Sequence, residues 1–185
     1  MYLIDECTRA IFFNFLDRNI SINEFEKWIY DNYSKLEIQI EPTMLYELVS
    51  FDYRQSHNIN MLDDYINKIL QPNEFEIWRI KNLLIDIIEN RIDIVLGTNL
   101  LSHLYDESDG LMMPVSLGVY YSSELDDVPF ASMYHLWNDK WLAEKLNKVE
   151  LYRENIINDC KDYLKILNDI EAVRKSRYEN RQQVI

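Results

Sequence analysis

Residues 21–33, Ser-Ile-Asn-Glu-Phe-Glu-Lys-Trp-Ile-Tyr-Asp-Asn-Tyr, contain both a helix start signal and a helical apolar face. Ser21 followed three residues later by Glu24 is a capping box, in which each side chain bonds the other residue's backbone N–H. Behind this signal, apolar side chains recur at the three- and four-residue spacing of an α-helix: Ile22, Phe25, Ile29 and Tyr33, with Trp28 beside them. The stretch therefore predicts an amphipathic helix that packs against a core.

The same spacing recurs on both sides of this stretch. Pro42 suits the first turn of a helix whose inner face is Leu45, Leu48 and Val49. Helices are also expected over residues 60–70, 72–87 and 98–107, and a long one over about 140–177. Within the long helix, an apolar stripe runs from Val149 to Ile170, which predicts either a core seam or a seam for a partner helix.

Turn-forming residues are sparse, since the chain has only 3 Gly and 4 Pro in 185 residues. Scarce turn residues favour helices over a sheet with many tight hairpins. We therefore expect a mainly α protein, a compact multi-helix bundle forming one domain over residues 1–185. At most a short β-hairpin or extended segment is expected near residues 112–121, where Val115, Leu117, Val119 and Tyr121 alternate with other residues. The expected core contains Phe25, Trp28, Ile29, Leu48, Trp78, Leu84, Tyr163 and Leu167.

Cysteine usage, the N-terminal sequence and the net charge indicate a cytoplasmic protein. The two cysteines, Cys7 and Cys160, are far apart and fit free thiols in a reducing compartment. The N-terminus has Asp5 and Glu6 where a signal peptide would carry basic residues. The net charge is -13, from 32 acidic and 19 basic side chains, so nucleic acid and anionic membranes would be repelled. A basic protein is the partner class that this charge favours.

No sequence signature of an enzyme is present. The three glycines stand alone, without a phosphate-binding loop, and the three histidines are scattered. His103, Asp106, Glu107 and Asp109 are close enough in sequence to consider a metal site. Their order lacks the spacing of a calcium loop, so we interpret them as a helix end followed by an acidic turn. We expect no catalytic residue, no metal and no cofactor.

The acidic charge is concentrated in one part of the chain. No Lys or Arg lies between Arg91 and Lys140, whereas this stretch contains eight acids and several aromatic residues. Acids accelerate encounter with a basic protein and aromatics provide buried anchors, so the stretch predicts a docking surface. The alternative is a solvated loop region whose aromatics face the core. The predicted partner-binding residues are Tyr105, Asp106, Glu107, Asp109, Tyr120, Tyr121, Glu124, Asp126 and Asp127.

The front half contains three short motifs: Phe25-Glu26-Lys27-Trp28-Ile29-Tyr30, Leu36-Glu37, and Leu45-Tyr46-Glu47-Leu48-Val49-Ser50-Phe51-Asp52-Tyr53. Together they resemble the front half of small bacterial immunity proteins encoded beside polymorphic and contact-dependent-inhibition toxins. The resemblance covers about thirty residues and implies a helical protein that neutralises a cognate toxin domain by tight binding. Many such toxins are nucleases, whose basic clefts suit an acidic inhibitor. The alternatives are an acidic phage-type or regulatory protein that mimics nucleic acid or scaffolds a complex, and an enzyme with an unrecognised active site.

Overall fold

The computed structural model describes residues 4–54, 59–108 and 112–182, and within these ranges it contains helices and no strand. The chain is 75% helical, which confirms the mainly α class. Contacts within the chain divide it into two compact units, residues 1–75 and 76–185, each with its own buried side chains. The single domain expected from the sequence stays a prediction. Within the described residues, no helix is both long enough and apolar enough to cross a membrane.

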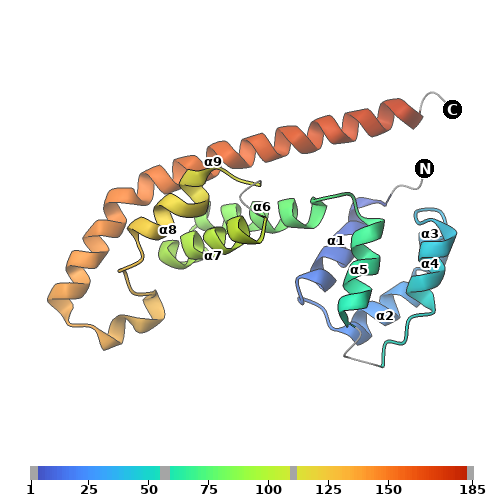
Figure 1. Cartoon of the computed structure of the whole chain (residues 1–185), viewed down its shortest axis with the longest axis horizontal. Coiled ribbons are helices and arrows are strands. Elements are labelled where there is room, and N and C mark those ends of the chain that lie inside the picture. The colour runs from blue at the N-terminus through green and yellow to red at the C-terminus, as the bar shows by residue number, and fades with distance from the viewer. Residues whose placement is uncertain (1–3, 55–58, 109–111, 183–185) are drawn as a thin grey trace. The chain divides into compact units, whose positions relative to one another are not determined.

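The first unit is built from short helices around a cluster of phenylalanines. The helices are α1 (Glu6–Leu16), α2 (Ile22–Asp31), α3 (Tyr33–Leu36), α4 (Pro42–Val49) and α5 (Ile59–Ile69) (Figure 1). Phe25 of α2 is fully buried, and its ring stacks on Phe15 of α1 with centroids 4.2 Å apart. Its other contact is edge-to-face with Phe12, at 5.8 Å. Aromatic pairs in these geometries stabilise a core beyond the area that they bury.

The expected helix starts are present in this unit. The Glu24 backbone N–H lies 3.3 Å from Ser21 Oγ, and the Ser21 N–H donates to Glu24 Oε2 at 2.7 Å, which confirms the capping box. Pro42 is the first residue of α4, where its missing N–H costs nothing. The Glu41 carboxylate accepts from the free N–H groups of that first turn.

Two tyrosines of the resemblance motifs close the C-terminal end of α4. The Tyr30 hydroxyl donates to the carbonyl oxygen of Val49 at 3.1 Å, and the Tyr53 hydroxyl donates to that of Leu48 at 2.8 Å. The last carbonyls of a helix lack partners within it, and the tyrosine hydroxyls supply hydrogen bonds at this end. The Leu48 carbonyl oxygen also accepts from the Phe51 N–H at 3.4 Å. Burial also raises the pKa of the Tyr53 hydroxyl. Tyr30 of α2 and Tyr53, which follows α4, are thus both bonded to the C-terminal end of α4.

The second unit contains longer helices and two irregular turns. After α6 (Glu74–Ile88), which begins at the unit boundary, come α7 (Ile94–Glu107), a π-helical turn η2 (Ser116–Tyr120) and α8 (Tyr121–Glu124). A 3₁₀ turn, η3 (Ala131–Leu136), then leads to α9 (Asp139–Gln182). Asp93 caps α7, because its carboxylate accepts from the Val95 and Leu96 N–H groups at 3.1 and 3.0 Å.

The apolar stripe of the last helix is a core seam. Val149, Ile156, Cys160 and Leu167 of α9 are all buried in the core of the second unit. Cys160 fills space there, and burial raises the pKa of its thiol to about 12. The described part of the stripe is therefore a core seam. The Ile170 side chain is not among those that the structure describes.

Residues 112–121, the stretch that permitted extended structure, are helical from Val115 onward. The buried side chains there follow a four-residue period: Met113, Leu117, Tyr121 and Leu125. Val115 and Val119, which gave the alternating pattern, are exposed. The alternation was produced by solvent-facing valines, whereas the spacing of the buried residues is helical.

The expected core residues fall into two groups. Phe25, Ile29, Leu48, Leu84 and Leu167 are buried. Trp28, Trp78 and Tyr163 are only half-buried. Large amphipathic rings sit at core edges because their polar atom needs a partner, and the Tyr163 hydroxyl finds one in the Met112 carbonyl oxygen.

Candidate protein-docking surface

Two of the predicted docking aromatics belong to the packing of the second unit. The Tyr105 ring of α7 lies against Gly118 of η2, where a side chain could not fit. Tyr121 is 5% exposed, and its hydroxyl donates to Asp159 Oδ2 at 2.9 Å. Burial and this carboxylate raise the pKa of Tyr121 to about 12. For these two residues the alternative interpretation, aromatics that face the core, is the one observed.

Several of the predicted docking acids are partnered within the second unit. Glu107 accepts from Arg79 at 2.7 Å, and Glu124 accepts from the Tyr152 hydroxyl at 2.8 Å. Asp127 pairs with Lys145 and, at 3.2 Å, with Lys148. Hydrogen bonding from Lys145 is the main cause that lowers the pKa of Asp127. The stretch between Arg91 and Lys140 contains no base, but the fold brings Arg79, Lys145 and Lys148 to its acids.

Of the other predicted residues, the three that the structure describes are exposed. Asp106 and Asp126 face solvent. Tyr120 is exposed while its ring contacts Tyr121 and Tyr152, with centroids 5.3 and 6.2 Å apart. Asp109 lies outside the described residues. Glu107 and Asp127 are exposed as well, but their ion pairs lower the net negative charge of this surface.

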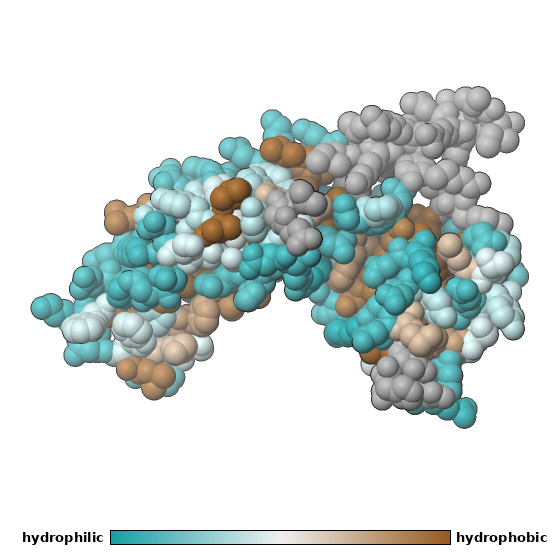
Figure 2. Space-filling model, viewed as in Figure 1, coloured by the Kyte–Doolittle hydropathy of each residue, from teal (hydrophilic) through white to brown (hydrophobic). Residues whose placement is uncertain are grey.

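An apolar tip follows this surface along the chain. Between α8 and the first turn of α9, four large side chains are exposed: Phe130, Met133, Leu136 and Trp141. Figure 2 shows brown side chains at the end of this connection. The charges near it are mainly negative, because five acids accompany Lys140 and Lys145 between residues 124 and 145: Glu124, Asp126, Asp127, Asp139 and Glu144. The tip therefore combines apolar area with a negative local charge.

The sequence places His103 close to three acids, Asp106, Glu107 and Asp109, which raises the question of a metal site. Across the part of the chain that the structure describes, no group of three or more His, Cys, Asp or Glu side chains has a geometry suited to a metal ion. Glu107 of this group is paired with Arg79 instead. Asp109, its last member, is not among the described residues.

A second surface, in the first unit, is not predicted by the sequence patterns. Of the five exposed large apolar side chains described in this unit, four lie between residues 30 and 46, and the fifth is Met61. We call the four the α2–α4 face: Tyr30, Tyr33, Ile38 and Tyr46. Ile38 is 77% exposed and Tyr46 is 73% exposed, so each shows most of its apolar surface to solvent.

Tyr33 belongs to this face although the sequence placed it on the buried side of a helix. The reason is a break in the helix at Asn32, where φ is -112° and ψ is 14°. Because α2 ends at Asp31 and α3 begins at Tyr33, the periodicity does not carry through. The Tyr33 hydroxyl instead bonds the Glu37 carboxylate, which raises the pKa of the tyrosine.

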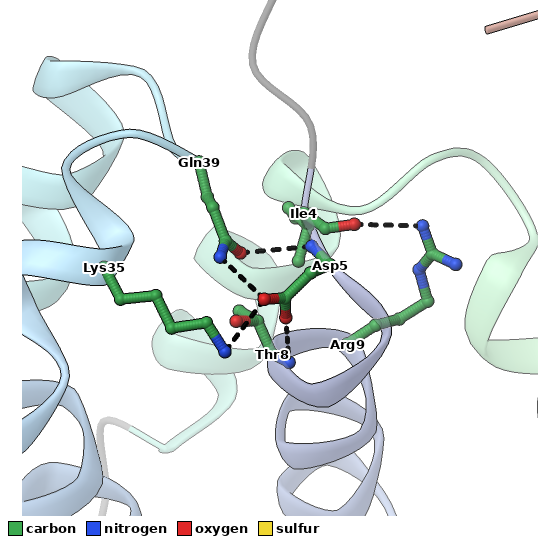
Figure 3. Close-up of polar contacts among 6 residues, drawn as sticks. All are labelled: Ile4, Asp5, Thr8, Arg9, Lys35 and Gln39. Atoms are coloured by element: carbon green, nitrogen blue, oxygen red, sulfur yellow. Dashed lines mark hydrogen bonds and ion pairs between the residues drawn. The ribbon is translucent and has the colours of Figure 1, made fainter. Parts of the chain in front are cut away.

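A polar clasp holds the segment that carries Ile38. Asp5 Oδ2 accepts from Gln39 Nε2 at 2.9 Å and from Lys35 Nζ at 2.8 Å (Figure 3). The Asp5 N–H returns a bond to Gln39 Oε1 at 3.1 Å, and Asp5 Oδ1 caps α1 through the Thr8 N–H at 2.8 Å. Although partial burial raises the pKa of Asp5, the bonds from Lys35, Thr8 and Gln39 outweigh it and hold that pKa well below its usual range.

The charge around the α2–α4 face is mainly negative. Five acids lie between residues 26 and 47, namely Glu26, Asp31, Glu37, Glu41 and Glu47, against only Lys27 and Lys35. Lys35 is paired with Asp5. The acids of this segment outnumber its bases, so the local charge favours cationic groups.

In comparisons with known proteins, no family model, no curated protein and no solved structure matched this chain.

Proposed function

We propose that this chain is a non-catalytic immunity protein that neutralises a basic bacterial toxin domain in the cytoplasm by tight, non-covalent binding. The observation that carries the proposal is the charge balance, with 32 acids and 19 bases. Even if every Lys and Arg neutralised one acid, 13 carboxylates would stay uncompensated. Such a molecule attracts basic proteins over long distances and repels nucleic acid and anionic membranes.

Two further features support binding as the mode of action. Exposed tyrosines and aliphatic side chains accompany the acids, and such anchors supply the buried area that a stable complex needs. Some of the motif residues that resemble immunity proteins occupy structural positions, as the bonds of Tyr30 and Tyr53 to the end of α4 illustrate. The resemblance therefore supports a shared framework for binding.

Growth rescue tests the proposal directly. The C-terminal toxin domain encoded by the gene adjacent to that of this chain is expressed from an inducible promoter, with and without the chain. We expect growth to be restored only by co-expression, and we expect the two purified proteins to form a complex whose association slows as salt rises. A toxin domain from an unrelated system is the control and should remain lethal. Continued killing with both proteins present at comparable levels would contradict the proposal.

A further inference from the structure

We infer that the α2–α4 face of the first unit is the surface that docks the basic protein partner, with Ile38 and Tyr46 as its principal anchors. The inference rests on the proposed function and assigns the contact to a surface that the sequence did not indicate. It is carried by the grouping of exposed anchors, by their fixed positions and by the charge around them.

The grouping of the anchors is the first step. Single exposed apolar side chains are normal on a soluble protein. Here four large ones fall within 17 consecutive residues, while the rest of the described first unit exposes only Met61. Because α2 contacts both α3 and α4, the four side chains are carried by one small group of helices and the turn after α3. Exposed apolar area gathered in this way is characteristic of interaction sites.

Two of the four side chains are also held in place before any partner binds. The Tyr30 hydroxyl donates to the Val49 carbonyl oxygen at 3.1 Å. Ile38 lies between Leu36 and Ile40, both buried, and is followed by Gln39, which the Asp5 clasp holds at two points. With its neighbours fixed, Ile38 projects to solvent from an ordered turn. Fixed anchors lose little conformational entropy on binding, which increases affinity.

The charge of the face selects the partner. Carboxylates accept bidentate hydrogen bonds from arginine, and tyrosine rings attract arginine and lysine through their faces. Exposed Asp31, Glu37 and Glu47 accompany the tyrosines of the α2–α4 face, so both kinds of contact are offered by the same segment. The partner that fits is a protein surface rich in arginine and lysine around an apolar patch.

The experiment compares truncations in the two units with matched exposure. Ile38→Ala and Tyr46→Ala remove anchors of the α2–α4 face, and Leu151→Ala removes a side chain of α9 that is 77% exposed, as Ile38 is. Dissociation of the full-length chain from the adjacent-gene toxin domain is measured for each variant. We expect each of the first two to dissociate about tenfold faster than wild type, as loss of an interface anchor does. Leu151→Ala should behave as wild type.

A charge pair supplies the second readout. Glu47→Lys should slow association at low salt, and the difference should shrink at high salt, whereas Glu154→Lys on α9 should have a smaller effect. Both positions are exposed, so folding is preserved, and circular dichroism checks this for every variant. If the wild type protects cells and binds while all α2–α4 variants match their controls, the inference fails and the proposed function stands. If the wild type neither binds nor protects, the proposed function itself fails and the inference with it.

Discussion

Replacing Gly118 with alanine should destabilise the second unit, because its η2 turn packs directly on α7. An added Cβ would lie 2.7 Å from the Tyr105 Cβ and nearer still to the Cγ and Cδ2 of that ring. Rotation about χ1 could move the ring away, but the Tyr105 Cβ is fixed by its own backbone. The substitution therefore requires η2 and α7 to separate by a fraction of an ångström.

The expected cost follows from two opposing effects. Overpacking a core costs about 1–3 kcal/mol, and a clash with a backbone-anchored atom belongs at the upper end of that range. Alanine recovers up to about 1 kcal/mol of helix propensity relative to glycine. The net loss is then about 2 kcal/mol, which lowers the urea midpoint by roughly 1 M for a typical small-protein slope of about 2 kcal/mol per M.

Urea unfolding followed by tryptophan fluorescence measures this loss, with Gly97→Ala as the matched control. A Cβ at Gly97 would meet Ile87 Cγ1 at 2.6 Å and Cδ1 at 2.9 Å, which are side-chain atoms that a rotamer change can move. Gly97→Ala should therefore cost less than Gly118→Ala. An unchanged midpoint for Gly118→Ala would refute the close packing of η2 on α7.

Three further perturbations have defined outcomes. Phe25→Ala should lower the free energy of unfolding by about 3–5 kcal/mol in chemical denaturation, because its ring is fully buried against two other phenylalanines. Asp5→Asn should lower the urea midpoint at neutral pH. The pKa of Asp5 in the folded state lies below its ordinary value of about 3.9, so its stabilisation is present above that pH and the deficit of the variant should narrow as pH falls from about 5 to 2. Stopped-flow mixing with the toxin domain should show several-fold slower association at low salt, and little change at high salt, after neutralising Glu124, Asp126 and Asp127 together.

Local signals predicted the helical part of the structure well. The capping box at Ser21 and the Val149–Leu167 stripe appear as expected, because caps and three-four spacing depend on neighbouring residues only. The residues 112–121 were ambiguous for the same reason, since exposed valines imitate a strand pattern until burial is known. The break at Asn32 likewise has no strong sequence signal, because no glycine or proline marks it.

The candidate site was harder to predict because ion pairs depend on distant residues. The stretch between Arg91 and Lys140 contains no base, yet Asp127 receives two lysines and Glu107 an arginine from the flanking helices. A charge count along the sequence cannot include such tertiary partners. The α2–α4 face was missed for another reason. Tyr33 follows a core-like spacing in the sequence, and only the packing of the folded chain shows that its ring is exposed.

The two cysteines give the chain a built-in pair of chemical reporters. Cys7 is exposed in the first turn of α1, so a thiol-reactive dye should attach there rapidly and place one fluorophore on the first unit of the unmutated protein. Cys160 is fully buried and its thiol is hard to ionise. A reagent can reach it only when α9 detaches locally or the second unit unfolds. The slow labelling phase therefore measures how often that unit opens under native conditions, and a bound partner that slows only this phase must be stabilising the second unit.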